Sequence, residues 1–201
     1  MTPIIVRVAA AALVGLAAFS CMRSGPARAA SSTGTWLTED GRARVRIEAC
    51  GPRKAQLCGY VVWVSKPLDG SGKAAVDTFH PDPGKRTRPL LGHQMILGLR
   101  PNEDGKHQGK IYNGDNGKSY DVTVWSETPS ELLVKGCMLA VLCGTKTWKR
   151  VTDVAPGQLT GPADAPGGPR SDPEWTAKSI VNDSVPVTSG RQVDGRSAPR
   201  N

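Results

Sequence analysis

Short segments in which hydrophobic and polar residues alternate run through the middle of the chain. The clearest covers residues 42–49, where apolar side chains stand at every second position from Ala43 to Ala49 with charged ones between them. Successive side chains of a strand point to opposite faces, so this segment predicts a strand with one face in solvent. Seven further segments predict strands: 35–38, 57–64, 94–99, 108–112, 119–125, 131–138 and 145–151.

Tight turns are expected between several of these strands. Asp40-Gly41, Asp104-Gly105 and Asn116-Gly117 supply residues that readily adopt the positive φ of short hairpins. Hairpins between consecutive strands give an up-and-down arrangement, and eight such strands can close into a barrel without a free edge. The sequence therefore predicts an all-β, eight-stranded antiparallel up-and-down barrel, whose interior is filled by side chains or holds one small ligand.

One connection is much longer than the others. Residues 65–88 are rich in Gly, Pro and charged residues and contain Phe79 as their only aromatic residue. Long ordered loops in small domains often serve a function. Two interpretations remain open for this loop: a lid over one end of the barrel, or a flexible surface insertion.

The first 29 residues have the features of a cleaved secretory signal. Arg7 is followed by an apolar stretch over 8–19, and Ala27-Arg28-Ala29 is a small-residue cleavage site. The apolar stretch is shorter than a membrane span requires, and no later segment is longer, so the mature chain has no predicted transmembrane segment. We therefore expect a periplasmic or secreted protein. The less favoured alternative is a lipid anchor on Cys21.

Cleavage near Ala29 leaves four cysteines, an even number in an oxidising compartment, where disulfides are the rule. Their order along the chain favours local pairs, Cys50 with Cys58 and Cys137 with Cys143. A zinc site would require closer spacing, such as Cys-x-x-Cys, so we predict no metal.

The chain divides into a domain over residues 30–151 and a tail over 152–201. The tail is dominated by Pro, Gly, Ser and charged residues, which predicts disorder, apart from a short helix that could begin at Asp172. The domain has 18 Lys and Arg against 12 Asp and Glu, a net charge of +6, and the tail has a net charge of −1. A basic surface favours anionic envelope components as partners, whereas export and the absence of a recognisable nucleic-acid module argue against nucleic acid.

No catalytic motif stands out. His80, His93 and His107 are too scattered to predict a metal site, and nothing fixes Asp69 and Asp77 as an acid–base pair. The sequence lacks the nucleophile elbow and the phosphate- and dinucleotide-binding loops. We predict no catalytic residues and no cofactor, and an enzyme is the less favoured interpretation.

Aromatic and charged residues near the long loop form the best candidate for a ligand site. These residues are Trp63, Asp77, Arg86, Arg88 and Tyr112. Binding pockets combine apolar walls with a few polar anchors in this way. The structural alternative is an ion pair between Asp77 and Arg88 that holds the loop in place.

A series of residues in fixed order resembles the bacterial family known as domain of unknown function 2147 (DUF2147). It comprises Gly34-x-Trp36, Val45-Arg46-Ile47, Cys50-Gly51, Leu57-Cys58-Gly59, Trp63, Asp69-x-x-Gly72, Asp77, Pro89-Leu90-x-Gly92, Ile111-Tyr112, Gly117-Lys118-x-Tyr120 and Trp148-x-Arg150-Val151. The chain departs from the family pattern at His80, where Asn is usual, and at Gly114, where Pro is common. The resemblance covers residues 33–151 and leaves the tail outside.

The resemblance implies an exported barrel of the lipocalin type with no established activity. In lipocalins a tryptophan of the first strand closes the barrel floor beneath a basic side chain of the last strand, and Trp36 and Arg150 match these structural positions. Two functions follow as hypotheses. The first is binding of a small apolar or anionic molecule, such as a lipid, inside the barrel. The alternative is a structural or adaptor module of the envelope with a filled barrel and a partner-binding basic face and tail.

Overall fold

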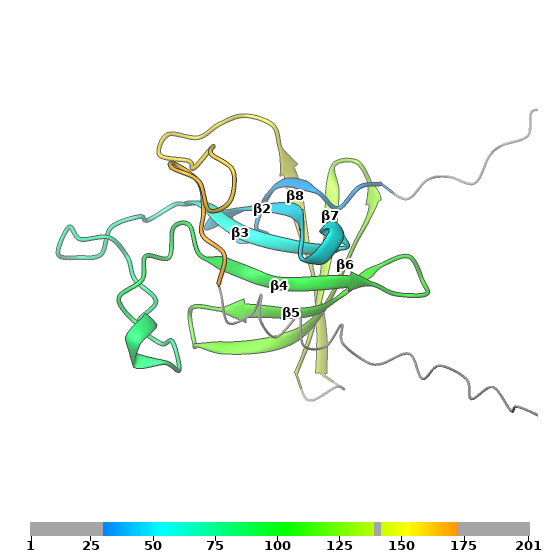
Figure 1. The fold of residues 1–201 in the computed structure, drawn as a ribbon, viewed down its shortest axis with the longest axis horizontal. Coiled ribbons are helices and arrows are strands. Elements are labelled where there is room, and N and C mark those ends of the chain that lie inside the picture. Colours follow the sequence, from blue (N-terminus) through cyan, green and yellow to red (C-terminus); the bar gives the residue numbers. More distant parts are fainter. Residues whose placement is uncertain (1–29, 139–141, 173–201) are drawn as a thin grey trace, which may run out of the picture.

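Eight consecutive strands pair with their neighbours, and the last pairs with the first to close a barrel (Figure 1). The computed structural model describes residues 30–138 and 142–172. The strands are β1 (Gly34–Leu37), β2 (Ala43–Cys50), β3 (Gln56–Val64), β4 (Gln94–Pro101), β5 (His107–Asn113), β6 (Lys118–Thr128), β7 (Glu131–Met138) and β8 (Leu142–Val151). Every pairing is antiparallel, and Trp36 of β1 stands opposite Arg150 of β8. The predicted up-and-down barrel is confirmed.

The two remaining regular elements are short 3-10 turns, η1 (Pro52–Lys54) and η2 (Pro83–Lys85). Among the described residues, none of the helical segments has the length and apolar character needed to cross a membrane.

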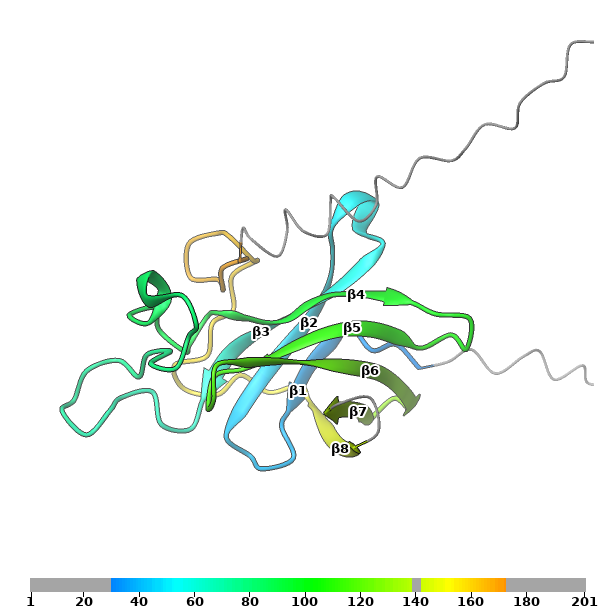
Figure 2. The same ribbon diagram turned by 90° about the horizontal axis from the view of Figure 1, so that it is seen from below.

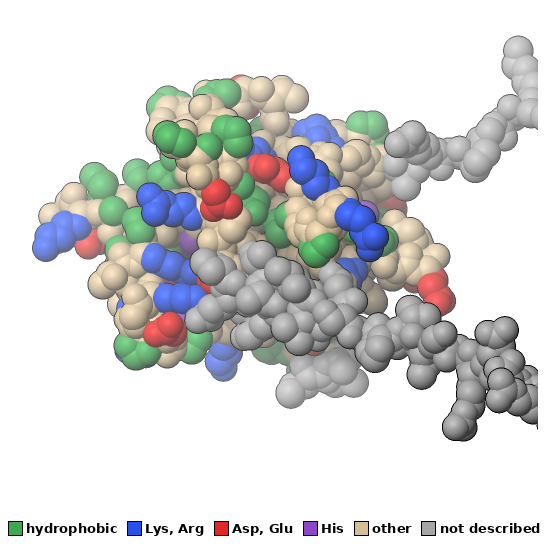
Figure 3. Space-filling model, viewed as in Figure 1, with side chains coloured by type: hydrophobic (Ala, Val, Ile, Leu, Met, Phe, Trp, Pro, Cys, Tyr) green, Lys and Arg blue, Asp and Glu red, His purple; other side chains and the backbone are tan. Residues whose placement is uncertain are grey.

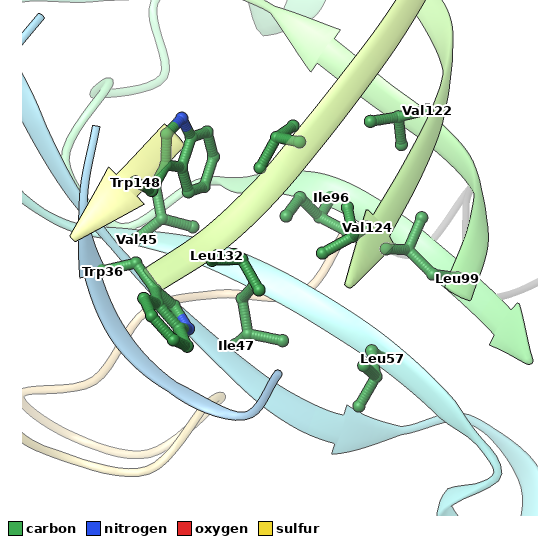
Figure 4. Packing of buried hydrophobic residues seen from close by; sticks show 11 residues of the cluster. Trp36, Val45, Ile47, Leu57, Ile96, Leu99, Val122, Val124, Leu132 and Trp148 are labelled. Carbon is green, nitrogen blue, oxygen red and sulfur yellow. The ribbon is translucent and has the colours of Figure 1, made fainter. Parts of the chain in front are cut away.

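Hydrophobic side chains from around the barrel fill its interior (Figure 4). Six of them have no solvent-accessible surface: Trp36, Val45, Ile96, Leu99, Val124 and Leu132. A side chain without accessible surface borders neither bulk solvent nor a cavity large enough for a water molecule. The barrel interior therefore has no space for a water-sized molecule next to these residues.

Disulfides join neighbouring strands at two places. Cys50 at the end of β2 is bonded to Cys58 of β3, and Cys137 of β7 is bonded to Cys143 of β8. Both predicted pairings are confirmed. The predicted signal segment and the alternative anchor at Cys21 lie outside the described residues.

The long connection between β3 and β4 projects from one end of the barrel (Figures 1 and 2). It folds back on itself through two isolated antiparallel bridges, Leu68 with Ala74 and Val76 with Pro89. Backbone bonds from Ala75 N to the Pro67 carbonyl and from Leu90 N to the Ala75 carbonyl reinforce them. The backbone of this segment is therefore ordered by two short antiparallel pairings. The bridge between Val76 and Pro89 determines which side chains of the loop face each other.

Residues 152–172, here called the strap, cross the outer face of β2 and β3. Leu159 and Ala163 of the strap pack against outward side chains of β3, and Leu159 N donates a 2.8 Å hydrogen bond to the Val62 carbonyl. Arg44 of β2 forms a 2.9 Å ion pair with Asp153. These contacts leave β3 buried on both faces over most of its length.

The strap differs from the disordered tail that the sequence predicts. Its Pro and Gly residues do exclude regular secondary structure, as expected. It is nevertheless held in place, because outward apolar side chains of β3 require cover and basic side chains of β2 attract its acidic and carbonyl oxygens. Residues 173–201, including all but the first residue of the predicted short helix, lie outside the described residues.

Candidate functional site

A buried carboxylate, Asp77, is the centre of a cluster of polar side chains on the long β3–β4 loop. Asp77 has no exposed surface. Its Oδ2 accepts a 3.0 Å hydrogen bond from Arg88 Nε and lies 2.9 Å from Arg88 Nη2. Its Oδ1 accepts a 2.6 Å hydrogen bond from the Tyr112 hydroxyl. Both carboxylate oxygens are therefore satisfied, as burial of a charge requires.

The backbone of the loop brings Asp77 and Arg88 together. The bridge between Val76 and Pro89 places the two segments side by side, and Asp77 N donates a 3.0 Å bond to the Arg88 carbonyl. Tyr112 approaches from the end of β5. Because Ile111 packs against the barrel core, the alternation of a strand directs Tyr112 to the outer face. The cluster consequently lies outside the barrel wall.

Arg88 also binds a second carboxylate, that of Asp172 at the end of the strap. Arg88 Nη1 lies 2.8 Å from Asp172 Oδ2, and Lys85 Nζ lies 3.1 Å from Asp172 Oδ1. Asp172 N donates a 2.9 Å bond to Gln94 Oε1, while Gln94 Nε2 donates to the Ile96 carbonyl. The Asp172 side chain is only 2% exposed, so this carboxylate is enclosed by its partners.

Two histidines flank the Tyr112 ring. The centroid of the Tyr112 ring lies 5.5 Å from that of His80 and 5.9 Å from that of His93. Burial, with the positive charge of Arg88, lowers the pKa of His93 to about 4, so its imidazole is neutral at pH 7. Burial and the Asp77 carboxylate raise the pKa of the Tyr112 phenol, which stays protonated.

The His93 imidazole also has an unsatisfied nitrogen. Its Nδ1 is buried without a hydrogen-bond partner among the described residues. Buried polar atoms of this kind are uncommon in folded proteins.

The chemistry of the cluster is that of a charge network. The carboxylates are paired with cations, and the Tyr112 phenol donates a hydrogen bond to the Asp77 carboxylate. The described part of the chain contains no group of His, Cys, Asp and Glu side chains suited to a metal ion. The arrangement is suited to holding carboxylates against Arg88 and Lys85.

Three of the five predicted ligand-site residues meet in this cluster: Asp77, Arg88 and Tyr112. Arg86 lies beside it, where its Nε donates a 2.8 Å hydrogen bond to the His80 carbonyl. The ion pair between Asp77 and Arg88 that the sequence suggested as the structural alternative is present.

Trp63 lies elsewhere. Its ring faces the Arg44 guanidinium, with Cζ 5.5 Å from the ring centroid. The register of β2 and β3 shifts between Arg44 and Val45, which accommodates an extra residue of β3 and turns Trp63 to the outer face beside Arg44. Trp63 therefore belongs to the barrel surface beside Arg44, which contacts the strap, and it takes no part in the contacts described for the Asp77 cluster.

Sequence reasoning missed Lys85, His93 and Gln94 as members of the cluster, and it missed the ion pairs of Asp172 with Lys85 and Arg88. The one available signal was the opposite charge of the basic domain and the acidic tail, which favours contact between them. It does not identify which residues pair.

Comparison with protein families matches residues 34–150 to a family described as an uncharacterized protein conserved in bacteria, DUF2147. The chain belongs to this family. The match covers the β3–β4 loop and all of the barrel except the last residue of β8, so Lys85, Arg88 and Gln94 lie inside the DUF2147 region, whereas Asp172 lies outside it. No curated protein matches the chain.

Among solved structures, this DUF2147 chain is similar to protein HP1028 from the human pathogen Helicobacter pylori, described as belonging to the lipocalin family. The two share 24% identity with a TM-score of 0.50, over 62% of this chain and 85% of the other. At this identity the likeness shows the fold, a lipocalin-like barrel.

Proposed function

We propose that this DUF2147 protein is exported to the periplasm and acts there as a non-enzymatic interaction module that recognises anionic partners on its outer surface. The observation that carries the proposal is the filled barrel. Six interior side chains from β1, β2, β4, β6 and β7 have no accessible surface, so they border no space for a guest. The two disulfides fit an oxidising compartment.

Storage of a small molecule inside the barrel receives less support. A lipocalin-type ligand occupies a cavity between the sheet walls, and here Trp36, Ile47 and Leu132 meet across that space (Figure 4). The predicted ligand residues Asp77, Arg88 and Tyr112 are grouped outside the wall and satisfy one another. Binding inside would require several core side chains to move together.

The exterior has the charge that an anionic partner requires. The domain over residues 30–151 has a net charge of +6, and Lys and Arg side chains are spread over the face drawn in Figure 3. The strap covers the side formed by β2 and β3, and its end reaches the start of β4. The β3–β4 loop, with Lys66 and Lys73, remains as a projecting basic surface.

Titration with a fluorescent fatty acid tests whether the interior is closed. We expect no saturable binding to the wild-type protein at micromolar concentrations. Leu132→Ala, which removes a fully buried side chain but leaves a cavity of only a few carbon atoms, should not admit the fatty acid either. Stoichiometric, saturable binding to the wild type would contradict the proposal.

Photo-crosslinking in the periplasm tests the outer surface. A photoreactive residue placed at Lys66 or Lys73 should give a discrete adduct with an envelope component, and high salt should diminish it because exposed charges are screened. The same residue placed at Leu132 should give none. If the loop positions yield no adduct, the proposed role as an interaction module is wrong.

A further inference from the structure

We propose that Arg88, Lys85 and the segment entering β4 form a binding site for an acidic residue of an extended peptide, and that the end of the strap is its resident intramolecular ligand. This inference deepens the proposed function, because it names the chemical class of the partner. It predicts that an acidic segment of another protein occupies the site when the strap end leaves it.

Main-chain contacts show that the site recognises extended backbone. Arg170 pairs with His93 in a parallel bridge, and Arg170 N donates a 2.8 Å bond to the Gly92 carbonyl. Two residues further on, Asp172 N donates to Gln94 Oε1 at 2.9 Å. A peptide that pairs with the segment before β4 in this way adds a short strand, a common mode of peptide recognition.

Side-chain contacts show that the site recognises a carboxylate. The two oxygens of Asp172 lie 3.1 Å from Lys85 Nζ and 2.8 Å from Arg88 Nη1. Asp77 holds the other edge of the Arg88 guanidinium, with Nη2 at 2.9 Å, so Arg88 is oriented before a peptide arrives. Such a preorganised, largely enclosed cation favours a carboxylate over a neutral side chain.

The occupant and the site come from separable parts of the chain. Every site residue lies within residues 34–150, the region of the family match, while the strap follows it. The strap contains no helix or strand between its first residue and Arg170. Figure 2 shows its end, in orange, next to the 3-10 turn η2 that contains Lys85. The end of the strap is therefore held by its contacts with the site and not by secondary structure of its own. A competing peptide that makes the same contacts can displace it.

Attachment to the same chain gives the strap an advantage over any free peptide. Tethered segments reach effective concentrations in the millimolar range, so a free peptide should bind the wild type weakly. Removing the Asp172 carboxylate should weaken the intramolecular ligand and make the site available. The comparison between these two forms of the full chain therefore measures the site itself.

Fluorescence anisotropy with a labelled peptide of residues 161–172, amidated at its C-terminus, provides the test. We expect the full-length Asp172→Ala protein to bind this peptide at least 10-fold more tightly than the wild type. A peptide with Asn in place of Asp172 should bind the variant at least 10-fold more weakly, and adding Lys85→Ala to the variant should weaken binding of the Asp peptide. The matched control Asp153→Asn removes an acidic strap residue that contacts Arg44 and should leave binding at the wild-type level.

Equal affinity of the Asp and Asn peptides for the variant, or equal affinity of variant and wild type for the Asp peptide, would overturn the inference. If Asp172→Ala does not fold, hydrogen exchange of the wild-type protein in the presence of millimolar peptide decides the question. The Asp peptide must then accelerate exchange at the Arg170 amide more than the Asn peptide does.

The two proposals can fail separately. Fatty-acid binding inside the wild-type barrel would defeat the proposed function alone. Failure of the peptide assays, in a protein that binds no fatty acid, would defeat only this inference.

Discussion

The Arg150 guanidinium occupies the position that a β-carbon on residue 34 would take. Glycine at position 34 leaves room for this side chain. A β-carbon there would overlap Arg150 Nη1. The guanidinium lies over the Trp36 indole, with Cζ 4.0 Å from the ring centroid, and donates to the Thr33 and Ser31 carbonyls at 2.9 and 2.8 Å. This arrangement secures the junction of β1 and β8, and it explains why glycine precedes the tryptophan by two positions.

Replacement of Gly34 by alanine should destabilise the barrel. Gly34 has φ 127°, which a residue with a side chain rarely adopts, and the added methyl group displaces Arg150 from Trp36. We expect a loss of about 1–3 kcal/mol in the free energy of unfolding, measured with urea. Gly136→Ala is the matched control, because the added carbon there meets nothing within 4 Å. A Gly34→Ala protein as stable as this control would show that the Arg150 position can shift at no cost.

The barrel itself could be predicted from the sequence because its determinants are local. Alternation over residues 42–49 identifies a strand and its buried face, and Asp104-Gly105 identifies a hairpin whose glycine has φ 72°. The disulfides follow the same rule, since each joins cysteines 8 or 6 positions apart. Short-range patterns of this kind determine the order of the strands almost completely.

The site could be predicted only in part because its contacts are long-range. Asp77 and Tyr112 are 35 positions apart, and Arg88 and Asp172 are 84 apart. The sequence groups Asp77, Arg88 and Tyr112 only by their residue types near the long loop, and no signal in it links them to Asp172. The Pro and Gly residues of the strap predict irregular backbone, but irregular backbone can still pack, and here an apolar outer face on β3 makes it do so. Trp63 is turned outward by a local register shift that alternation does not reveal.

Loss of the Tyr112 hydroxyl should weaken the loop anchor. Tyr112→Phe leaves Asp77 Oδ1 buried without the donor that now lies 2.6 Å away. An unsatisfied buried acceptor typically costs about 1–3 kcal/mol, and we expect a decrease of that size in the free energy of urea unfolding. Tyr120→Phe is the control, because its hydroxyl accepts an exposed bond from Asn116 and its loss should cost less than about 0.5 kcal/mol. Equal effects of the two substitutions would argue against a stabilising role for the buried bond.

Removal of the two disulfides should have different effects: one should lower the stability of the whole protein, and the other should loosen a single hairpin. Each closes a short loop, for which chain entropy gives about 2–3 kcal/mol. Cys58 is 7% exposed and packs beneath the strap, so Cys50→Ala with Cys58→Ala should lower the free energy of global unfolding. Met138 and Leu142, which flank the second pair, are 51% and 62% exposed. Cys137→Ala with Cys143→Ala should therefore mainly accelerate hydrogen exchange in the β7–β8 hairpin. Faster exchange throughout the barrel in this second variant would contradict the local effect.

Acid should destabilise the protein through His93. The pKa of His93 is lowered to about 4, mainly by burial and to a smaller extent by the positive charge of Arg88. Asp77 and Asp172 oppose this lowering more weakly. Below about pH 6.5 the unfolded chain binds a proton at this residue, whereas the folded protein does not. The free energy of unfolding therefore decreases as the pH falls from about 6.5 toward 4, by up to about 1.4 kcal/mol per pH unit.

Urea unfolding at pH 7.5, 6 and 5 should show this decline in the wild type and a flatter profile in His93→Gln, because glutamine does not titrate. His107→Gln is the control: burial also lowers the His107 pKa, but this side chain is less buried, so its removal should flatten the profile less. Parallel profiles for the wild type and His93→Gln between pH 7.5 and 5 would mean that His93 takes up its proton in the folded protein as readily as in the unfolded chain.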